Sequence, residues 1–257
     1  MPALLDLTRL SVRQFAERFR GEMIQLSNTF SYYCASIPMT EDDLKEYLQE
    51  PVAALPPALT AALPKISILL VPYLERANGR GSKTPASDFV SIEKPPEGKT
   101  STSTQLRLGD ETVLAFALKD QEVAEYHYRF YHLLATLMGE HWSDETEAAY
   151  GRVLREELNA DAHGEVDEPS WRLKQTLRRV QNSRGGAVKN SKTFREYARQ
   201  SFIDTLTLYL HGICCDIDVD TGPRQLPSRY LRRRLMALEQ MFPPPSGYAV
   251  FPEQLEP

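Results

Sequence analysis

The chain has 257 residues, of which 42% are hydrophobic and 25% are charged, so it can bury a sizeable core of its own. Its formal net charge of −5 argues against general binding to nucleic acids or to acidic membranes. We therefore expect a globular protein in which any site for a polyanion is confined to a local patch.

Cysteine usage and the first residues indicate the compartment. Cys34, Cys214 and Cys215 do not form a disulfide framework, which favours a reducing environment. Residues 1–10 lack the basic segment and long apolar run of a secretory signal, and the longest apolar run, residues 66–71, is too short to span a bilayer. The prediction is a cytoplasmic protein that makes no membrane contact.

The first 50 residues favour helices. Ser11 and Gln14 are typical of a capping box, and the apolar spacing after them predicts one long helix that continues to Ile37. A proline then ends this helix, and Thr40 with the acidic residues after it predicts the start of a shorter one. Residues 1–50 are therefore a predicted N-terminal helical subdomain.

A small sheet is predicted in the next part of the chain. Its candidate strands are apolar or alternating segments bounded by turn residues, namely residues 66–74, 89–92, 105–108 and 112–118. The last two are joined across Gly109 and Asp110 and resemble a hairpin. We expect three to four strands in an antiparallel arrangement.

Amphipathic helices dominate the rest of the chain. Apolar residues spaced three or four apart predict helices over residues 121–141, 143–162, 170–181, 194–214 and 228–242. The expected fold class is mainly α (α+β), with long helices packed against the small sheet in a single globular domain of residues 1–257. Residues 243–257, rich in proline, are predicted to form an extended tail.

The end of the helix over residues 194–214 carries a dense set of metal-ligating side chains. The candidate ligands are His211, Cys214, Asp216 and Asp218. Imidazole and thiolate suit zinc, whereas carboxylates suit a harder divalent cation. The spacing fits neither a calcium loop nor a zinc site with a second ligand pair. The alternative is that the cysteines are buried hydrophobic residues and the aspartates a solvated edge.

A second ligand set for a metal is His127 with carboxylates such as Glu157, brought beside it by folding. The chain has no His-Glu-x-x-His sequence, and no histidine has a glutamate three residues before it. These absences argue against a standard zinc hydrolase or di-metal carboxylate site. The competing interpretation is that the histidines on the helix over residues 121–141 belong to the core or to an interface.

Arginines cluster near the C-terminus. Arg224, Arg229, Arg232 and Arg233 are candidates for binding phosphate or nucleic acid, because the last three share a helix face. Pairing with nearby aspartates competes with this interpretation. Neither interleaved aromatic residues nor a helix-turn-helix pattern accompanies the charges, so nucleic-acid binding is not the favoured function.

No standard catalytic motif stands in the sequence: a nucleophile elbow, dinucleotide-binding glycines and a phosphate loop are all missing. We therefore expect a binding, scaffold or regulatory protein that acts through contacts with another protein or with a second copy of itself. The alternatives are a metal-dependent hydrolase with a nonstandard His/Cys/Asp site, and a phosphate- or RNA-binding protein. A divalent metal ion is the one cofactor that the sequence leaves open.

Overall fold

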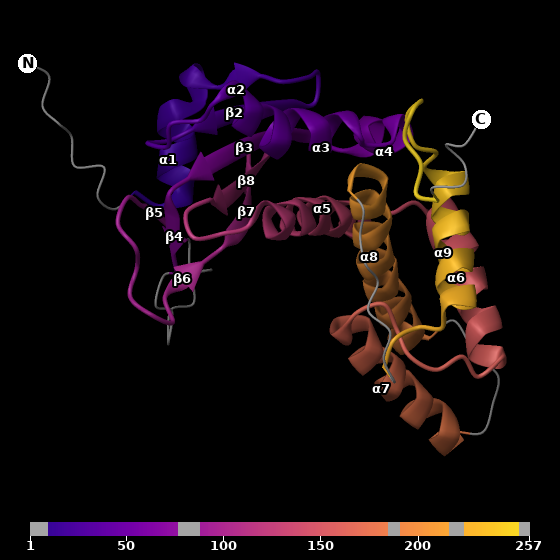
Figure 1. Ribbon diagram of the computed structural model, residues 1–257. Helices are drawn as coiled ribbons and strands as arrows, with labels where there is room; N and C mark the ends of the chain where they lie inside the picture. Colours follow the sequence, from indigo (N-terminus) through magenta and orange to yellow (C-terminus); the bar gives the residue numbers. More distant parts are fainter. Residues whose placement is uncertain (1–9, 77–87, 185–190, 216–223, 252–257) are drawn as a thin grey trace, which may run out of the picture. The chain divides into compact units, whose positions relative to one another are not determined.

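The computed structural model describes residues 10–76, 88–184, 191–215 and 224–251 (Figure 1). The chain divides into two compact units. Unit 1 comprises residues 1–49 and 63–129, and unit 2 comprises residues 50–62 and 130–257. The boundary falls within α5 (Val123–Glu140), so this helix contributes residues to both units.

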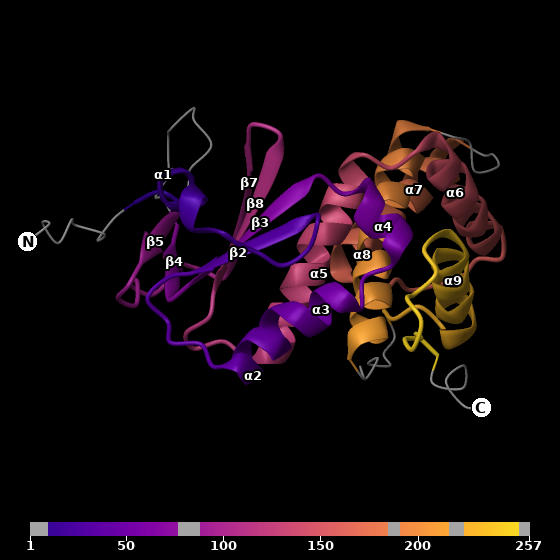
Figure 2. The same cartoon turned by 90° about the horizontal axis from the view of Figure 1, so that it is seen from above.

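Unit 1 is built on a five-stranded mixed sheet. In spatial order the strands are β1 (Ile24–Gln25), β2 (Phe30–Cys34), β3 (Lys65–Val71), β8 (Glu111–Ala117) and β7 (Ser103–Leu108). β3 pairs in parallel with β2 and with β8, and the two edge strands run antiparallel to their neighbours. Figure 2 shows β2, β3 and β8 side by side. Every side chain from Ile66 to Val71 is buried, as expected for a central strand covered on both faces.

A second, three-stranded antiparallel sheet completes the β structure of unit 1. Its strands are β5 (Phe89–Ser91), β4 (Tyr73–Glu75) and β6 (Thr100–Ser101), in that spatial order. The backbone around Ser11 pairs with β5: Val12 N donates to Asp88 O at 2.8 Å, and Val90 N donates to Leu10 O at 2.9 Å. These bonds hold the start of α1 (Val12–Phe19) against the smaller sheet.

Helical segments cover both faces of the larger sheet. The predicted capping box of Ser11 and Gln14 is present, and α1 packs its buried face against a core that includes Leu69 and Val113. On the other face, the ring of Tyr126 lies 4.9 Å from that of Phe116 and 5.1 Å from that of Tyr47. The shorter helical segments of unit 1 are η2 (Arg20–Glu22), α2 (Glu41–Leu44) and η3 (Lys45–Gln49).

Unit 2 is helical. Its helices are α3 (Glu50–Ala53), α4 (Pro57–Ala62), the later part of α5, α6 (Asp144–Asn159), α7 (Glu168–Arg184), α8 (Lys192–Cys214) and α9 (Ser228–Met241). α8 contacts α6, α7 and α9, and most of its side chains are buried. A helix that is buried on several sides is the core of its unit, so α8 is the element around which unit 2 is assembled.

The predicted sheet was wrong in size and direction. The larger sheet has five strands, and its centre is parallel rather than antiparallel. The prediction failed because the residues of β1 and β2 were assigned to a helix. Phe30 and Tyr33 continue a three-residue spacing from α1, but Phe30, Tyr32 and Cys34 also fit the two-residue alternation of a strand, which the aromatic side chains favour.

The prediction of one long N-terminal helix is therefore wrong beyond Phe19, where α1 ends. Residues 1–50 contain β1 and β2 as well as helices. The mainly helical character of the chain is confirmed, and so is the hairpin of β7 and β8. The predicted single domain stays a prediction. Within the predicted tail, the described residues 243–251 form neither helix nor strand, and Phe251 is buried.

Candidate functional site

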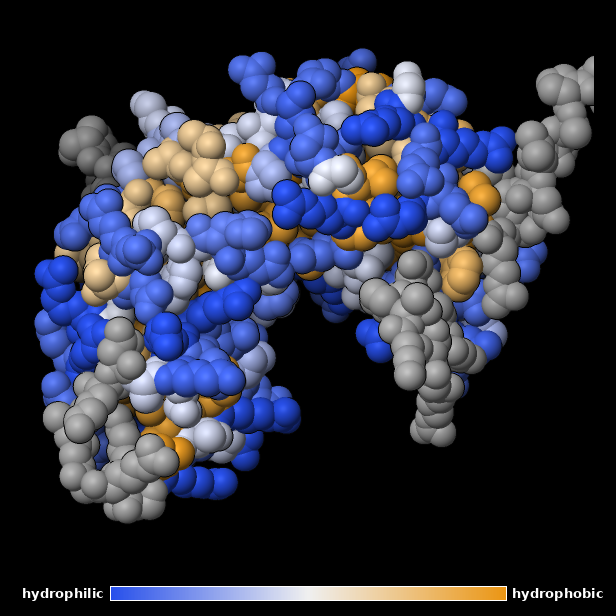
Figure 3. Space-filling view, turned by 180° about the vertical axis from the view of Figure 1, so that it is seen from behind, coloured by the Kyte–Doolittle hydropathy of each residue, from blue (hydrophilic) through white to orange (hydrophobic). Residues whose placement is uncertain are grey.

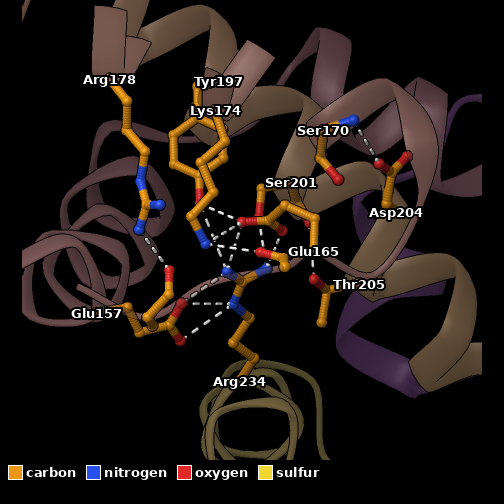
Figure 4. A network of polar contacts seen from close by, with 12 residues as sticks. Glu157, Glu165, Ser170, Lys174, Arg178, Tyr197, Ser201, Asp204, Thr205 and Arg234 are labelled. Atoms are coloured by element: carbon orange, nitrogen blue, oxygen red, sulfur yellow. Dashed lines mark hydrogen bonds and ion pairs between the residues drawn. The ribbon is translucent and has the colours of Figure 1, made fainter. Parts of the chain in front are cut away.

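A buried ion network lies in unit 2 among α6, α7, α8 and α9 (Figure 4). Its charged members are Glu157, Glu165, Lys174 and Arg234, and each of these side chains has an exposed fraction of 0%. Two carboxylates face two cations, so the network as a whole is neutral. The protein interior tolerates such charges only when they are paired and hydrogen-bonded, and here both conditions hold.

The guanidinium group of Arg234, on α9, is the centre of the network. Its Nε and Nη2 donate to Oε2 of Glu157, on α6, at 3.0 Å and 2.6 Å. Its Nη1 donates to Oε2 of Glu165 at 2.7 Å, and its Nη2 to Oε1 at 3.0 Å. Nη1 also donates to Ser201 Oγ on α8 at 2.8 Å. Two bidentate pairs use all three guanidinium nitrogens, a geometry that a lysine cannot reproduce.

Glu165 accepts from two further side chains. Nζ of Lys174, on α7, lies 3.0 Å from Oε1 of Glu165 and donates to the carbonyl oxygen of Gly164 at 2.7 Å. The hydroxyl of Tyr197, on α8, donates to the Glu165 carboxylate. A single carboxylate therefore connects α7, α8 and α9, because it accepts from a side chain of each.

The backbone around Glu165 is held in an extended form beside residues 224–226. Glu165 N donates to Arg224 O at 2.9 Å, and Leu226 N donates to Glu165 O at 3.0 Å. The preceding residue, Gly164, has φ of +72°, and a Cβ there would overlap the carbonyl group of Gln225. Glycine is required at this position because only glycine satisfies both the backbone angle and the close approach.

The protonation of the network follows from its contacts. Burial tends to raise the pKa of Glu165, but attraction to Arg234 and Lys174 together with the donated hydrogen bonds outweighs it and lowers the pKa from 4.5 to about 2. Burial lowers the pKa of Lys174, and Glu165 opposes that effect. Burial and the neighbouring Glu165 charge raise the pKa of Tyr197. Glu165 is therefore ionised at neutral pH, and the Tyr197 hydroxyl keeps the proton that it donates.

This geometry supports a structural role for the network. Each charged group is paired inside it, and none is exposed to solvent. An acid, base or nucleophile must reach its substrate to act on it, so these groups would be inaccessible without local opening of unit 2. The network instead fixes the relative positions of α6, α7, α8 and α9.

Sequence reasoning missed this network, although its spacing is visible. Arg234 falls on the same α9 stripe as Leu231 and Leu238, three residues after the first and four before the second, and the structure buries all three. Glu157 lies on the Tyr150 and Leu154 stripe of α6, but the sequence suggested it only as a metal ligand beside His127. The signal in the sequence was a charged residue on an apolar stripe. What the sequence did not show was which charged residue of another helix pairs with it.

The predicted metal ligands are brought together in part. His211 and Cys214 lie in the last turn of α8, whereas Asp216 and Asp218 lie outside the described residues. The structure adds Cys215, whose sulfur lies within 4.8 Å of a ring nitrogen of His211. A hydrogen-bonding contact with Cys215, supported by Tyr131 and opposed by burial, lowers the pKa of Cys214 to about 7.

The two residues of the second predicted metal site, His127 and Glu157, belong to different units. His127 belongs to unit 1, where its Nε2 lies 2.9 Å from the backbone oxygen of Glu46. Glu157 belongs to unit 2, where both of its carboxylate oxygens accept from Arg234. Glu157 is therefore committed to a guanidinium group.

The four arginines predicted to bind phosphate contact different neighbours. The guanidinium groups of three of them lie over aromatic rings: Arg224 over Trp171 at 4.9 Å, Arg229 over Tyr230 at 4.6 Å and Arg232 over Phe251 at 4.4 Å. The fourth, Arg233, pairs with Glu156 on α6. Stacking of this kind contributes about 0.5–1 kcal/mol at exposed sites and leaves the charge in place. Phosphate binding by these residues stays a prediction.

An apolar groove lies between α6 and α9 on the surface of unit 2. Its volume is about 440 Å³. Its apolar lining is Ala149, Val153, Met236, Ala237 and Met241, and its polar lining is Arg152, Glu156, Arg233 and Gln240. Met236 is 45% exposed, an unusual fraction for a large hydrophobic residue in the part of the chain that the structure describes.

No family model matches this chain, and no curated protein or solved structure matches it either. In the segments that the structure describes, no helix combines the length and the apolar character needed to cross a membrane.

Proposed function

We propose that this protein is a binding or scaffold component whose helical unit receives an acidic, amphipathic helix of a partner protein in the α6–α9 groove. The observation that carries the proposal is the groove itself: apolar side chains form most of its lining, and Arg152 and Arg233 are among its polar lining residues. Helix-in-groove recognition needs a hydrophobic channel of this kind and reads anchors spaced three and four residues apart.

The lining suits a partner helix. Met236 and Met241 have flexible, polarisable side chains, which adapt to an incoming apolar residue better than branched ones do. Ala149 and Ala237 are small, so they leave room for the anchors of the partner. Figure 3 shows one face of the molecule, which is largely hydrophilic with hydrophobic residues between.

Charge determines the expected chemistry of the partner. Glu156 is paired with Arg233, whereas Arg152 has no ion-pair partner within the described ranges. Arg152 also lines a neighbouring hollow together with Arg155, Arg195, Asp144 and Glu147, where three cations face two carboxylates. The edge of the groove thus has an excess of positive charge, which favours glutamates or aspartates along the partner helix.

The buried network supports the proposal from a different direction. It connects α6 and α9 through Glu157 and Arg234, so the two walls of the groove are held by a completely buried ion pair. A pre-organised groove binds its partner at a lower entropic cost than one that must form on binding.

A designed helical peptide tests the proposal. Its leucines would repeat at three- and four-residue spacing, and its flanks would carry glutamates in one version and lysines in the other. We expect the glutamate version to bind the full chain. The affinity of the lysine version should be lower by a factor of at least about ten, which corresponds to about 1.4 kcal/mol of binding free energy. Fluorescence anisotropy of the labelled peptide measures both affinities.

Matched variants locate the binding surface. Met236→Glu places a carboxylate in the groove and should abolish binding of the acidic peptide. Ile24→Glu, at another exposed hydrophobic residue, in unit 1, should leave binding unchanged. Equal binding by both variants, or equal binding of the two peptides, would contradict the proposal. Concentration-dependent dimerisation that Met236→Glu removes would assign the groove to a second copy of the chain instead.

A further inference from the structure

We propose that His211, Cys214 and Cys215, at the C-terminal end of α8, form a binding site for a soft d¹⁰ metal ion, Zn²⁺ or Cu⁺. These residues lie in unit 2, and the inference is independent of the α6–α9 groove. The candidate ligands predicted from the sequence were His211 and Cys214 with two aspartates, whereas the site proposed here uses Cys215.

The backbone places His211 and Cys215 on one side of the helix end. They are four residues apart, and Cys215 N donates to His211 O at 2.9 Å, which continues the helical hydrogen-bond pattern to the C-cap. Residues four apart on a helix project side by side. Their ligand atoms accordingly lie within 4.8 Å of one another, so one ion between them would reach both with only a small side-chain adjustment.

Cys214 supplies the second sulfur. It directly precedes Cys215 at the end of α8, so a second sulfur lies one residue from the pair. None of the three cysteines of the chain, Cys34 included, forms a disulfide in the structure. Two thiols and an imidazole within a single turn are a compact donor set of soft and borderline ligands.

The chemistry of these donors selects the ion. Thiolate and imidazole favour Zn²⁺ and Cu⁺, whereas Ca²⁺ and Mg²⁺ require oxygen ligands. The C-terminus of a long helix carries a partial negative charge, which favours a cation at this end of α8. His211, Cys214 and Cys215 are each partly exposed, so an ion can enter from solvent.

A neighbouring aromatic side chain orients the imidazole. The ring of Tyr131 lies 5.9 Å from the ring of His211, and its hydroxyl donates to the backbone oxygen of Pro51 at 3.3 Å. A ligand held by a packed neighbour loses less rotational freedom when the ion binds. Binding replaces the thiol protons, which pass to the buffer, so affinity should rise with pH.

Metal titration of the full chain, reduced with a phosphine and free of added metal, tests the site. Competition against a chromogenic Zn²⁺ chelator and against a Cu⁺ chelator forms the two arms, and the arm with tighter binding identifies the ion. We expect one ion per chain in at least one arm. His211→Ala and Cys215→Ser should each weaken binding by about tenfold or more, because removing even a supporting residue of a metal site costs 10–100-fold.

Cys34→Ser is the matched control, because it removes one thiol from unit 1 and should leave the affinity unchanged. Alkylation of the unmodified chain gives a second readout that depends on no variant: bound metal should protect Cys214 and Cys215 from iodoacetamide but leave the labelling of Cys34 unaltered. Failure of both ions to bind, or binding that is unaffected by His211→Ala and Cys215→Ser, would overturn the proposal. Loss of binding in Cys34→Ser would overturn it as well.

Discussion

Arg234 and Glu157 form a completely buried ion pair between α9 and α6, with Nη2 of the arginine 2.6 Å from Oε2 of the glutamate. The adjacent residues Arg233 and Glu156 pair between the same two helices, but their side chains are 49% and 46% exposed. One position along each helix thus separates a surface ion pair, which contributes little to stability, from a buried one, whose disruption is costly.

Acid should destabilise unit 2 through Glu165. Its pKa of about 2 in the folded chain lies below the ordinary value of 4.5, so the unfolded chain takes up the proton first as the pH falls. The stabilisation is fully present above pH 4.5 and should be lost progressively between about pH 4.5 and pH 2. Urea unfolding at several pH values measures this slope. Glu165→Gln should reduce it, and an identical slope in the variant would show that another group is responsible.

Loss of the Tyr197 hydroxyl should cost more than loss of the Tyr150 hydroxyl. Tyr197 donates to the charged Glu165, whereas Tyr150 donates to the neutral Thr205 Oγ1 at 2.7 Å, and both tyrosines are fully buried. Bonds to charged groups contribute about 1.5–3 kcal/mol and neutral ones about 0.5–1.5 kcal/mol. The free energy of unfolding of Tyr197→Phe and Tyr150→Phe compares them directly. A larger loss in Tyr150→Phe would be inconsistent with an ionised Glu165.

Replacement of Gly164 by alanine should destabilise unit 2 more than replacement of Gly247. Both glycines have positive φ, +72° and +88°, so alanine is strained at either position by about 1–2 kcal/mol. At Gly164 the new Cβ would also overlap the backbone of Gln225, whereas at Gly247 it meets no atom within 4 Å. Thermal unfolding of the two variants measures the difference. Equal melting temperatures would mean that the backbones of Gly164 and Gln225 do not approach each other closely in solution.

The sequence predicts the helices of unit 2 well because their apolar stripes are long. α8 and α9 have the predicted character and end near the predicted residues, Cys214 and Phe242. The parallel sheet of unit 1 was harder to predict, because β2 and β3 are separated by about 30 residues and five residues of β2 carry too short a pattern to distinguish strand from helix.

The buried network could not be predicted as a whole for a similar reason. Arg234 and Glu157 each lie on an apolar stripe, which signals a buried charge, but their pairing depends on how α6 and α9 pack. Glu165 lies in a segment without periodicity, and only its pairing with residues 224–226 brings it to Arg234. The local sequence pattern therefore identifies candidate buried charges, whereas only the packing of the helices identifies which of them form ion pairs.

The central claim is that the buried ions hold unit 2 together and thereby shape the surface between α6 and α9. Urea unfolding of Arg234→Met beside Arg233→Met tests it most directly, because the two variants remove the same side chain from adjacent residues of one helix. We expect Arg234→Met to lose about 3–5 kcal/mol, since it leaves the buried Glu157 without its partner and removes one of the two cations beside Glu165. Arg233→Met should change stability by at most about 1 kcal/mol. Equal stability of the two variants would contradict the account.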